Sequence, residues 1–150
     1  MTKITHIDHI GIAVRELDRS IERFRTILGA ELIDRTEVSI NNSRVVAAHL
    51  KLGGHIIVLD SSDDPKSPIA RYLSKHGEGL HHLCLEVDDL ERFTTLLEEK
   101  GINISYRNST NPNRKEIFIH PGDFCGVLLQ IIEWTGEPDL NVEDRIQNRL

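Results

Sequence analysis

Residues 6–14 have the sequence HIDHIGIAV, and residues 80–87 have the sequence LHHLCLEV. In both stretches branched apolar residues alternate with smaller or polar ones, which is typical of a half-buried β-strand. Each stretch is followed by an amphipathic segment with apolar residues at helical spacing. Each amphipathic segment ends at a glycine, Gly29 or Gly101, where a helix C-cap belongs. The same local plan therefore occurs twice.

The two stretches belong to an internal repeat. When His9 is aligned with His82, an offset of 73 residues, Leu17 falls on Leu90. Each half alone is too small to bury an adequate core, so the two halves are expected to pair. The predicted domain spans 1–150, with one βαβββ module at about 4–61, a linker helix at about 67–76, a second module at about 79–134 and a polar tail at 135–150.

The composition is that of a globular chain in water. The 150 residues carry a formal charge of −6, and the mean hydropathy is −0.29. An acidic chain argues against nucleic-acid and membrane-surface partners, and no apolar run approaches the roughly 18 residues of a membrane span. No signal-peptide core follows the first residues, so a cytoplasmic location is expected. Two cysteines form neither a disulfide framework nor a Cys-based zinc site, so imidazole and oxygen ligands would hold any metal.

Period-two alternation assigns side chains to the two faces of the predicted sheets. His9 and His82 fall on the face opposite the helices, at equivalent places in the repeat. The same 73-residue offset pairs Ile57 with Gln130, and both are predicted on that face. A pseudo-two-fold would bring the four side chains together in the mouth between the sheets. The expected constellation is two imidazoles, one amide and one apolar side chain.

Three further motifs are more specific than a hydrophobic pattern: SPIARYL at 67–73, GEGLHH at 77–82 and HPGDFCGVL at 120–128. With them, residues 6–134 resemble the vicinal oxygen chelate superfamily of glyoxalases, bleomycin resistance proteins and dioxygenases. Within it the chain is most similar to the methylmalonyl-CoA epimerase-like proteins. The resemblance implies an α+β fold whose paired βαβββ modules form a U-shaped, partly open β-barrel-like cleft with helices outside.

The resemblance also implies a metal site. In the superfamily, the equivalents of positions 9, 57, 82 and 130 are usually His, Glu or Gln, His and Glu. A divalent ion (Zn, Co, Mn, Ni or Fe) is therefore expected at His9, His82 and Gln130. Ile57 has no lone pair and is expected only to line the pocket. Gln130 keeps an amide oxygen but cannot accept a proton near neutrality, so the base thought to stand there in the epimerases is missing.

Three functions remain compatible with these residues. The first is a glyoxalase- or epimerase-like isomerase or lyase, whose metal chelates vicinal oxygens of a small substrate such as a CoA thioester and promotes proton transfer through an enolate. The second is Fe(II) dioxygenase-like chemistry at a His-His-Gln site. The third is a metal-free protein that sequesters small molecules, which the loss of both carboxylate ligands favours.

The remaining site predictions concern the proton acceptor and the pocket. His49 and Glu86 are the candidate bases, because each lies on a predicted strand that could direct it into the pocket. Cys84 is expected as a small pocket or core residue, and His120 as a residue that shapes a turn or the pocket rim. A homodimer is expected because members of the superfamily commonly dimerise.

Overall fold

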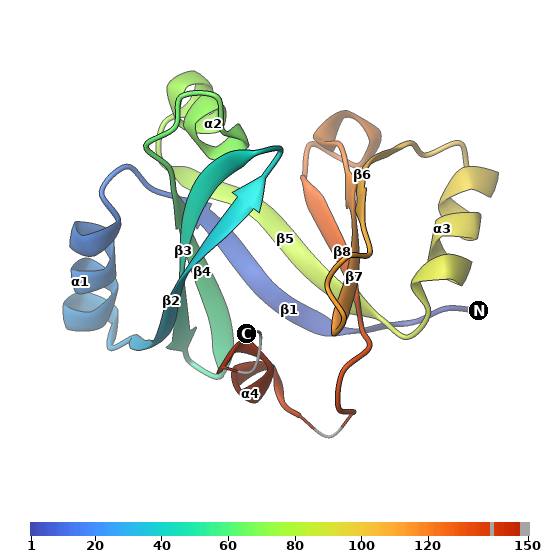
Figure 1. Cartoon of the computed structure of the whole chain (residues 1–150), viewed down its shortest axis with the longest axis horizontal. Helices are drawn as coiled ribbons and strands as arrows, with labels where there is room; N and C mark the ends of the chain where they lie inside the picture. Colours follow the sequence, from blue (N-terminus) through green and yellow to red (C-terminus); the bar gives the residue numbers. More distant parts are fainter. Residues whose placement is uncertain (139, 148–150) are drawn as a thin grey trace. The chain divides into compact units, whose positions relative to one another are not determined.

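A computed structural model describes residues 1–138 and 140–147 of the chain. The chain alternates strands and helices in the order that the repeat predicts (Figure 1). In chain order the elements are β1 (Ile4–Ala13), α1 (Leu17–Leu28), β2 (Glu31–Ile40), β3 (Ser43–Leu52), β4 (His55–Ser61), α2 (Pro68–His76), β5 (Gly79–Val87), α3 (Leu90–Glu99), β6 (Ile104–Asn108), β7 (Arg114–Ile119), the 3-10 helix η1 (Pro121–Asp123), β8 (Leu129–Trp134) and α4 (Val142–Gln147).

The chain divides into two compact units, each made of two segments. The His82 unit consists of Met1–His9 and His82–Leu140, and the His49 unit consists of Ile10–His81 and Asn141–Leu150. Both β1 and β5 therefore contribute residues to both units.

In the His49 unit, α1 packs against one face of a four-stranded sheet (Figure 1). β3 pairs antiparallel with β2 and with β4, while β4 pairs parallel with β1. α1 ends at Gly29, whose φ of 68° is left-handed and whose N–H donates to the Arg25 carbonyl. The buried core between α1 and the sheet consists of Val14, Leu17, Ile21, Ala30, Val46, Ala48, Leu50, Ile57 and Leu59.

The His82 unit repeats this plan. β5 pairs parallel with β8, β8 pairs antiparallel with β7, and β7 pairs antiparallel with β6. α3 starts at Asp89, whose side chain accepts the Arg92 N–H and so caps the helix. The core comprises Val87, Leu90, Leu97, Ile117, Ile119, Leu129 and Ile131. The prediction of an α+β chain with two βαβββ modules is thus confirmed.

The strand register corrects one residue of the predicted repeat. Ile57 lies in the core that packs against α1, whereas the 73-residue offset had placed it on the opposite face. In the His82 unit, Gln130 stands opposite Cys84 in the parallel pair. The matching position in the His49 unit, opposite Gly11, is occupied by Val58. A one-residue slip between the halves exchanges the two faces, so Val58 and not Ile57 is the counterpart of Gln130.

The segment predicted as a polar tail contains a helix with a buried face. Ile146 of α4 is 2% exposed and packs with Val58 in a small apolar cluster on the sheet face opposite α1. An ion pair between Lys51 and Glu143, 2.9 Å from Nζ to Oε2, joins the helix to β3. The sequence pattern missed this packing because a six-residue helix offers too few apolar positions to establish a period.

α2 begins and ends as the sequence predicts. The Ser67 hydroxyl accepts the Ala70 N–H at 2.9 Å, which is the expected N-cap. Tyr72 stacks edge-on against His81, with ring centroids 4.8 Å apart. Burial lowers the pKa of His81 to about 4, so this ring is neutral near pH 7.

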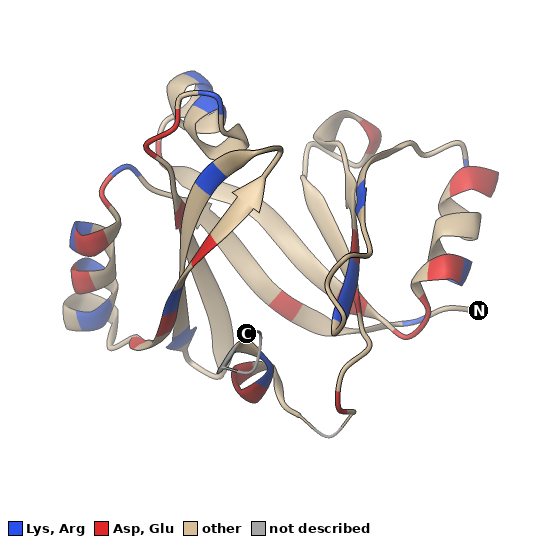
Figure 2. Cartoon of the chain, in the orientation of Figure 1, with Lys and Arg blue, Asp and Glu red and all other residues tan. Residues whose placement is uncertain are grey.

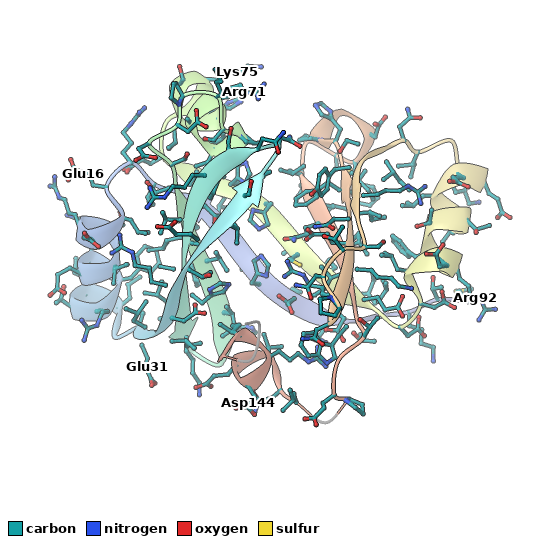
Figure 3. All side chains as sticks on the ribbon, in the orientation of Figure 1. Glu16, Glu31, Arg71, Lys75, Arg92 and Asp144 are labelled. Atoms are coloured by element: carbon teal, nitrogen blue, oxygen red, sulfur yellow. The ribbon has the colours of Figure 1, made fainter. Side chains whose placement is uncertain are left out.

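Residues of both charges are interspersed along α1 and α3 (Figure 2). Glu16, Arg71 and Lys75 project away from the ribbon (Figure 3) and are exposed. This mixed distribution agrees with the acidic, globular composition. In the part of the chain that the structure describes, every helix is too short or too polar to cross a membrane.

Candidate functional site

His9 and His82 face each other in the His82 unit. Their Nε2 atoms are 2.9 Å apart, and the rings meet edge to face at 89°. A hydrogen bond at this distance requires one Nε2 to donate and the other to accept. Two imidazole nitrogens bound to one metal ion, each at about 2.0–2.1 Å, stand at a similar separation of roughly 3 Å. The distance between Nε2 of His9 and Nε2 of His82 therefore suits two nitrogens that bind one metal ion.

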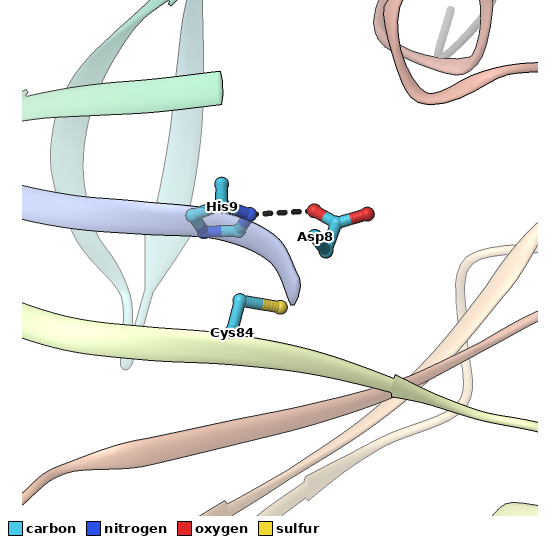
Figure 4. Close-up of side chains that lie close together, drawn as sticks. All are labelled: Asp8, His9 and Cys84. Carbon is cyan, nitrogen blue, oxygen red and sulfur yellow. Dashed lines mark hydrogen bonds and ion pairs between the residues drawn. The ribbon is translucent and has the colours of Figure 1, made fainter. Parts of the chain in front are cut away.

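Asp8 holds the other nitrogen of His9. Its Oδ1 lies 2.6 Å from His9 Nδ1, and both side chains are buried (Figure 4). A carboxylate accepts, so Nδ1 donates its proton and Nε2 keeps a lone pair. Carboxylates in this position orient metal-binding histidines and increase their basicity. The sequence analysis missed Asp8, because alternation along a strand directs neighbouring residues to opposite faces.

Cys84 on β5 lies close to this pair (Figure 4). Its thiol is fully buried, and the possible ligand atoms of Asp8, His9 and Cys84 all lie within 4.8 Å of one another. These three residues form a second possible donor set, which the count of cysteines had argued against. In His9 the Asp8 contact engages Nδ1, whereas the His82 contact engages Nε2.

Gln130 lies on β8, between Cys84 on β5 and Phe118 on β7. It is 6% exposed, and its amide nitrogen donates to Glu116 Oε2 at 2.6 Å. The guanidinium of Arg114 lies 3.4 Å from the same oxygen. The sequence analysis missed Glu116, although its alternation with Phe118 along β7 could have placed both on one face.

Glu86 belongs to a polar cluster at the far end of β5 from His81. It is 8% exposed, and its Oε2 lies 3.5 Å from His6 Nε2. The possible ligand atoms of His6, Asp8 and Glu86 also lie within 4.8 Å of one another. Glu86 is thus a nearly buried carboxylate beside an imidazole, which is a suitable environment for an acid–base group.

His49 is the second candidate base. It is 4% exposed on β3, and its Nδ1 lies 2.6 Å from Asp34 Oδ1 on β2. The flanking residues Ala48 and Leu50 point into the core against α1, so His49 faces the other way. The Asp34 carboxylate accepts, so Nδ1 of His49 donates in this contact, as in a histidine–carboxylate dyad. The sequence analysis proposed His49 but did not find its partner.

His120 shapes a turn. Its Nδ1 accepts the Gly122 N–H at 3.0 Å and caps η1, and the residue is exposed. This agrees with the turn role, which was one of the two roles expected of it.

The sequence matches the model of a known superfamily. Residues 8–118 match the Glyoxalase/Bleomycin resistance protein/Dioxygenase superfamily. The chain belongs to this superfamily.

Two proteins with similar sequences are named as epimerases. Over 128 residues the chain is 31% identical to the mitochondrial methylmalonyl-CoA epimerase of Homo sapiens, covering 83% of this chain and 72% of the human protein. Over 134 residues it is 30% identical to the ethylmalonyl-CoA/methylmalonyl-CoA epimerase of Cereibacter sphaeroides, covering 85% and 97% respectively.

Solved structures show the same fold. The methylmalonyl-CoA epimerase of Mycobacterium tuberculosis superposes with a TM-score of 0.76 at 32% identity, over 88% of this chain and 89% of that one. A variant of the Streptomyces coelicolor epimerase, in complex with 2-nitronate-propionyl-CoA, superposes with a TM-score of 0.75 at 27% identity. That superposition covers 89% of this chain and 100% of the Streptomyces chain.

Proposed function

We propose that this chain is a metal-dependent isomerase that moves a proton at the carbon beside the carbonyl of an acyl-CoA thioester. The observation that carries the proposal is the convergence of His9 and His82 at 2.9 Å between Nε2 atoms, with Asp8 holding the far side of His9. The similarity to methylmalonyl-CoA epimerases supports the choice of an α-branched acyl-CoA as substrate.

The residues present suit a divalent ion. His9 and His82 would contribute Nε2 atoms and Gln130 its amide oxygen, which is an imidazole and oxygen set accepted by Zn, Co, Mn, Ni and Fe. When bound, such an ion polarises two substrate oxygens and favours the enolate over the neutral thioester. Val58 offers no donor atom at the counterpart of Gln130.

The chain supplies proton acceptors other than Gln130, whose amide cannot take a proton near neutrality. We propose His49 for this role, because it is a nearly buried imidazole whose Nδ1 is held by the carboxylate of Asp34. Glu86 is the second proposed acceptor, since its carboxylate is nearly buried beside His6. Epimerisation needs a proton removed from one face of the carbon and returned to the other.

The experiment is solvent exchange into methylmalonyl-CoA. We expect the protein loaded with Co²⁺ or Zn²⁺ to incorporate one deuterium from D2O at the acidic carbon, measured by mass spectrometry. The variants His9→Ala and His82→Ala should lose both the bound metal and the exchange. His55→Ala, which removes an exposed imidazole at the start of β4, should keep both. A wild-type protein that binds metal but exchanges no deuterium contradicts the proposed reaction.

One observation favours a second reaction. A set of two histidines and one oxygen donor, here His9, His82 and Gln130, would resemble the three-ligand sites of non-haem Fe(II) oxygenases. Oxygen uptake by the Fe²⁺ protein, without deuterium exchange, would support this alternative. A metal-free sequestering protein predicts neither metal binding nor exchange. The expected homodimer and cytoplasmic location stay predictions.

A further inference from the structure

Glu116 contacts the side-chain amide of Gln130, which stands where the superfamily usually has a glutamate ligand. We propose that Glu116 is a positioning residue, which orients Gln130 so that Oε1 is its ligand atom and which supplies the negative charge that Gln130 lacks. This inference rests on the metal site proposed above. Nothing in the similarity to the epimerases assigns a role to Glu116.

The hydrogen bond determines which way the amide points. An ionised carboxylate accepts hydrogen bonds and donates none, so only the amide nitrogen of Gln130 can face Glu116 at 2.6 Å. The amide oxygen is then directed away from Glu116. A glutamine without such a partner can present either end, and only the oxygen end binds a metal ion. Glu116 therefore selects the productive orientation.

Burial makes the contact strong. The side chain of Glu116 is 12% exposed and Gln130 is 6% exposed, so little water competes for either group. A hydrogen bond to a charged group in such surroundings is shorter and stronger than a neutral one. The carboxylate stands one hydrogen bond behind the amide, and the nearby guanidinium of Arg114 offsets part of its negative charge.

Neighbouring residues hold the carboxylate in place. Arg114 lies 3.4 Å from Oε2, and the amide nitrogen of Asn108 lies 3.4 Å from Oε1. Glu116 turns to the face opposite α3, because Ile117 and Ile119 of the same strand are in the α3 core. The position of the Glu116 carboxylate is therefore set by the register of β7 and by its contacts with Arg114 and Asn108.

The arrangement repeats what Asp8 does for His9. In both cases a carboxylate with little exposed surface accepts a hydrogen bond from a nitrogen of a proposed ligand, so the other donor atom of that side chain does not face the carboxylate. Outer carboxylates of this kind typically contribute about 10- to 100-fold to metal affinity. The two carboxylates together offset the absence of a directly bound one.

The first test is Glu116→Gln, measured by calorimetric titration of the metal-free protein with Co²⁺. We expect Co²⁺ to bind about 10- to 100-fold more weakly, because the charge is lost and the new amide no longer dictates the orientation of Gln130. The visible absorption of bound Co²⁺ should change as well, since it reports the ligand atoms. Glu98→Gln is the matched control, because Glu98 is an exposed partner of Arg107 and should leave both readouts unchanged.

The second test exchanges the two groups. The double variant Glu116→Gln with Gln130→Glu returns the carboxylate to the ligand position and gives it an amide neighbour. We expect this variant to bind Co²⁺ at least as tightly as the wild type, which a merely structural defect in Glu116→Gln would not allow.

The outcomes separate this inference from the proposed function. If wild-type protein binds Co²⁺ and Glu116→Gln binds it within about twofold, the role of Glu116 is wrong and the metal site stands. If the double variant binds Co²⁺ no better than Glu116→Gln does, Glu116 does not supply the negative charge that Gln130 lacks. If the wild-type protein binds no Co²⁺ at all, both this inference and the proposed function are overturned.

Discussion

The Nε2 atoms of His9 and His82, residues separated by 73 positions in the chain, lie 2.9 Å apart. The two histidines occupy equivalent places in β1 and β5, so an internal repeat has brought two copies of one side chain together. Asp8 makes the pair asymmetric, because it holds His9 at 2.6 Å. The proposed metal site would depend on carboxylates that do not themselves need to bind the ion.

Asp8→Asn should weaken metal binding without unfolding the protein. The neutral amide removes the charge that increases the basicity of His9, and a loss of about 10- to 100-fold in affinity is expected. Calorimetric titration with Zn²⁺ measures it, and exposed Asp123→Asn is the control. Equal affinities for the two variants would show that the Asp8 contact is not part of the metal site.

His49→Gln should lower the rate of deuterium exchange and leave metal content unchanged. A general base typically contributes about 10²- to 10⁴-fold, so a decrease in that range is expected in kcat. Asp34→Asn should produce a smaller decrease, because the imidazole remains but loses the partner that fixes its tautomer. His55→Gln serves as the control, and a normal rate in His49→Gln would leave Glu86 as the remaining candidate.

Two titratable groups of the His49 unit, Asp60 and His81, should give opposite pH dependences of stability. Burial raises the pKa of Asp60 from 3.8 to about 7, so the folded state binds the extra proton between these values. The free energy of unfolding therefore falls as pH rises through this window, by up to about 4 kcal/mol. The pKa of His81 is lowered from 6.5 to about 4, so between these pH values the unfolded state binds a proton that the folded state does not. Stability from this group rises with pH by up to about 3 kcal/mol.

Single variants should separate these contributions. As the pH rises from about 4 to 6.5, the free energy of unfolding of Asp60→Asn should increase and that of His81→Gln should decrease. The free energy of unfolding of the wild type should change little over this range. Urea unfolding at several pH values measures the free energy of unfolding, with exposed Asp63→Asn as the control. If the free energies of unfolding of the two variants change with pH in the same direction, this explanation is wrong.

Ile146→Ala should release α4 from the sheet. Removal of a buried isoleucine typically costs about 2–5 kcal/mol, but here the loss cannot exceed the free energy that docks a six-residue helix. We expect hydrogen exchange of the α4 amides to lose protection while the β3 and β4 amides keep theirs. Glu143→Gln, which breaks only the exposed pair with Lys51, should cost less than about 1 kcal/mol.

The sequence alone predicted the two modules and the equivalence of His9 and His82. Both follow from local periodicity, since a strand exposes alternate residues and a repeat of one plan places the same residue at the same point of each copy. The helix cap at Ser67 was equally accessible, because a cap depends only on residues within one turn.

The tertiary structure decided the rest of the site. Which residue of β4 stands at the counterpart of Gln130 depends on pairing with β1, and one residue of slip exchanged Ile57 for Val58. The partners Asp34 and Glu116 lie on neighbouring strands, 15 and 14 residues from the side chains they hold. Such contacts are set by register between strands, which no local pattern encodes, so the sequence determined where the imidazoles lie and the folded sheet decided which carboxylates support them.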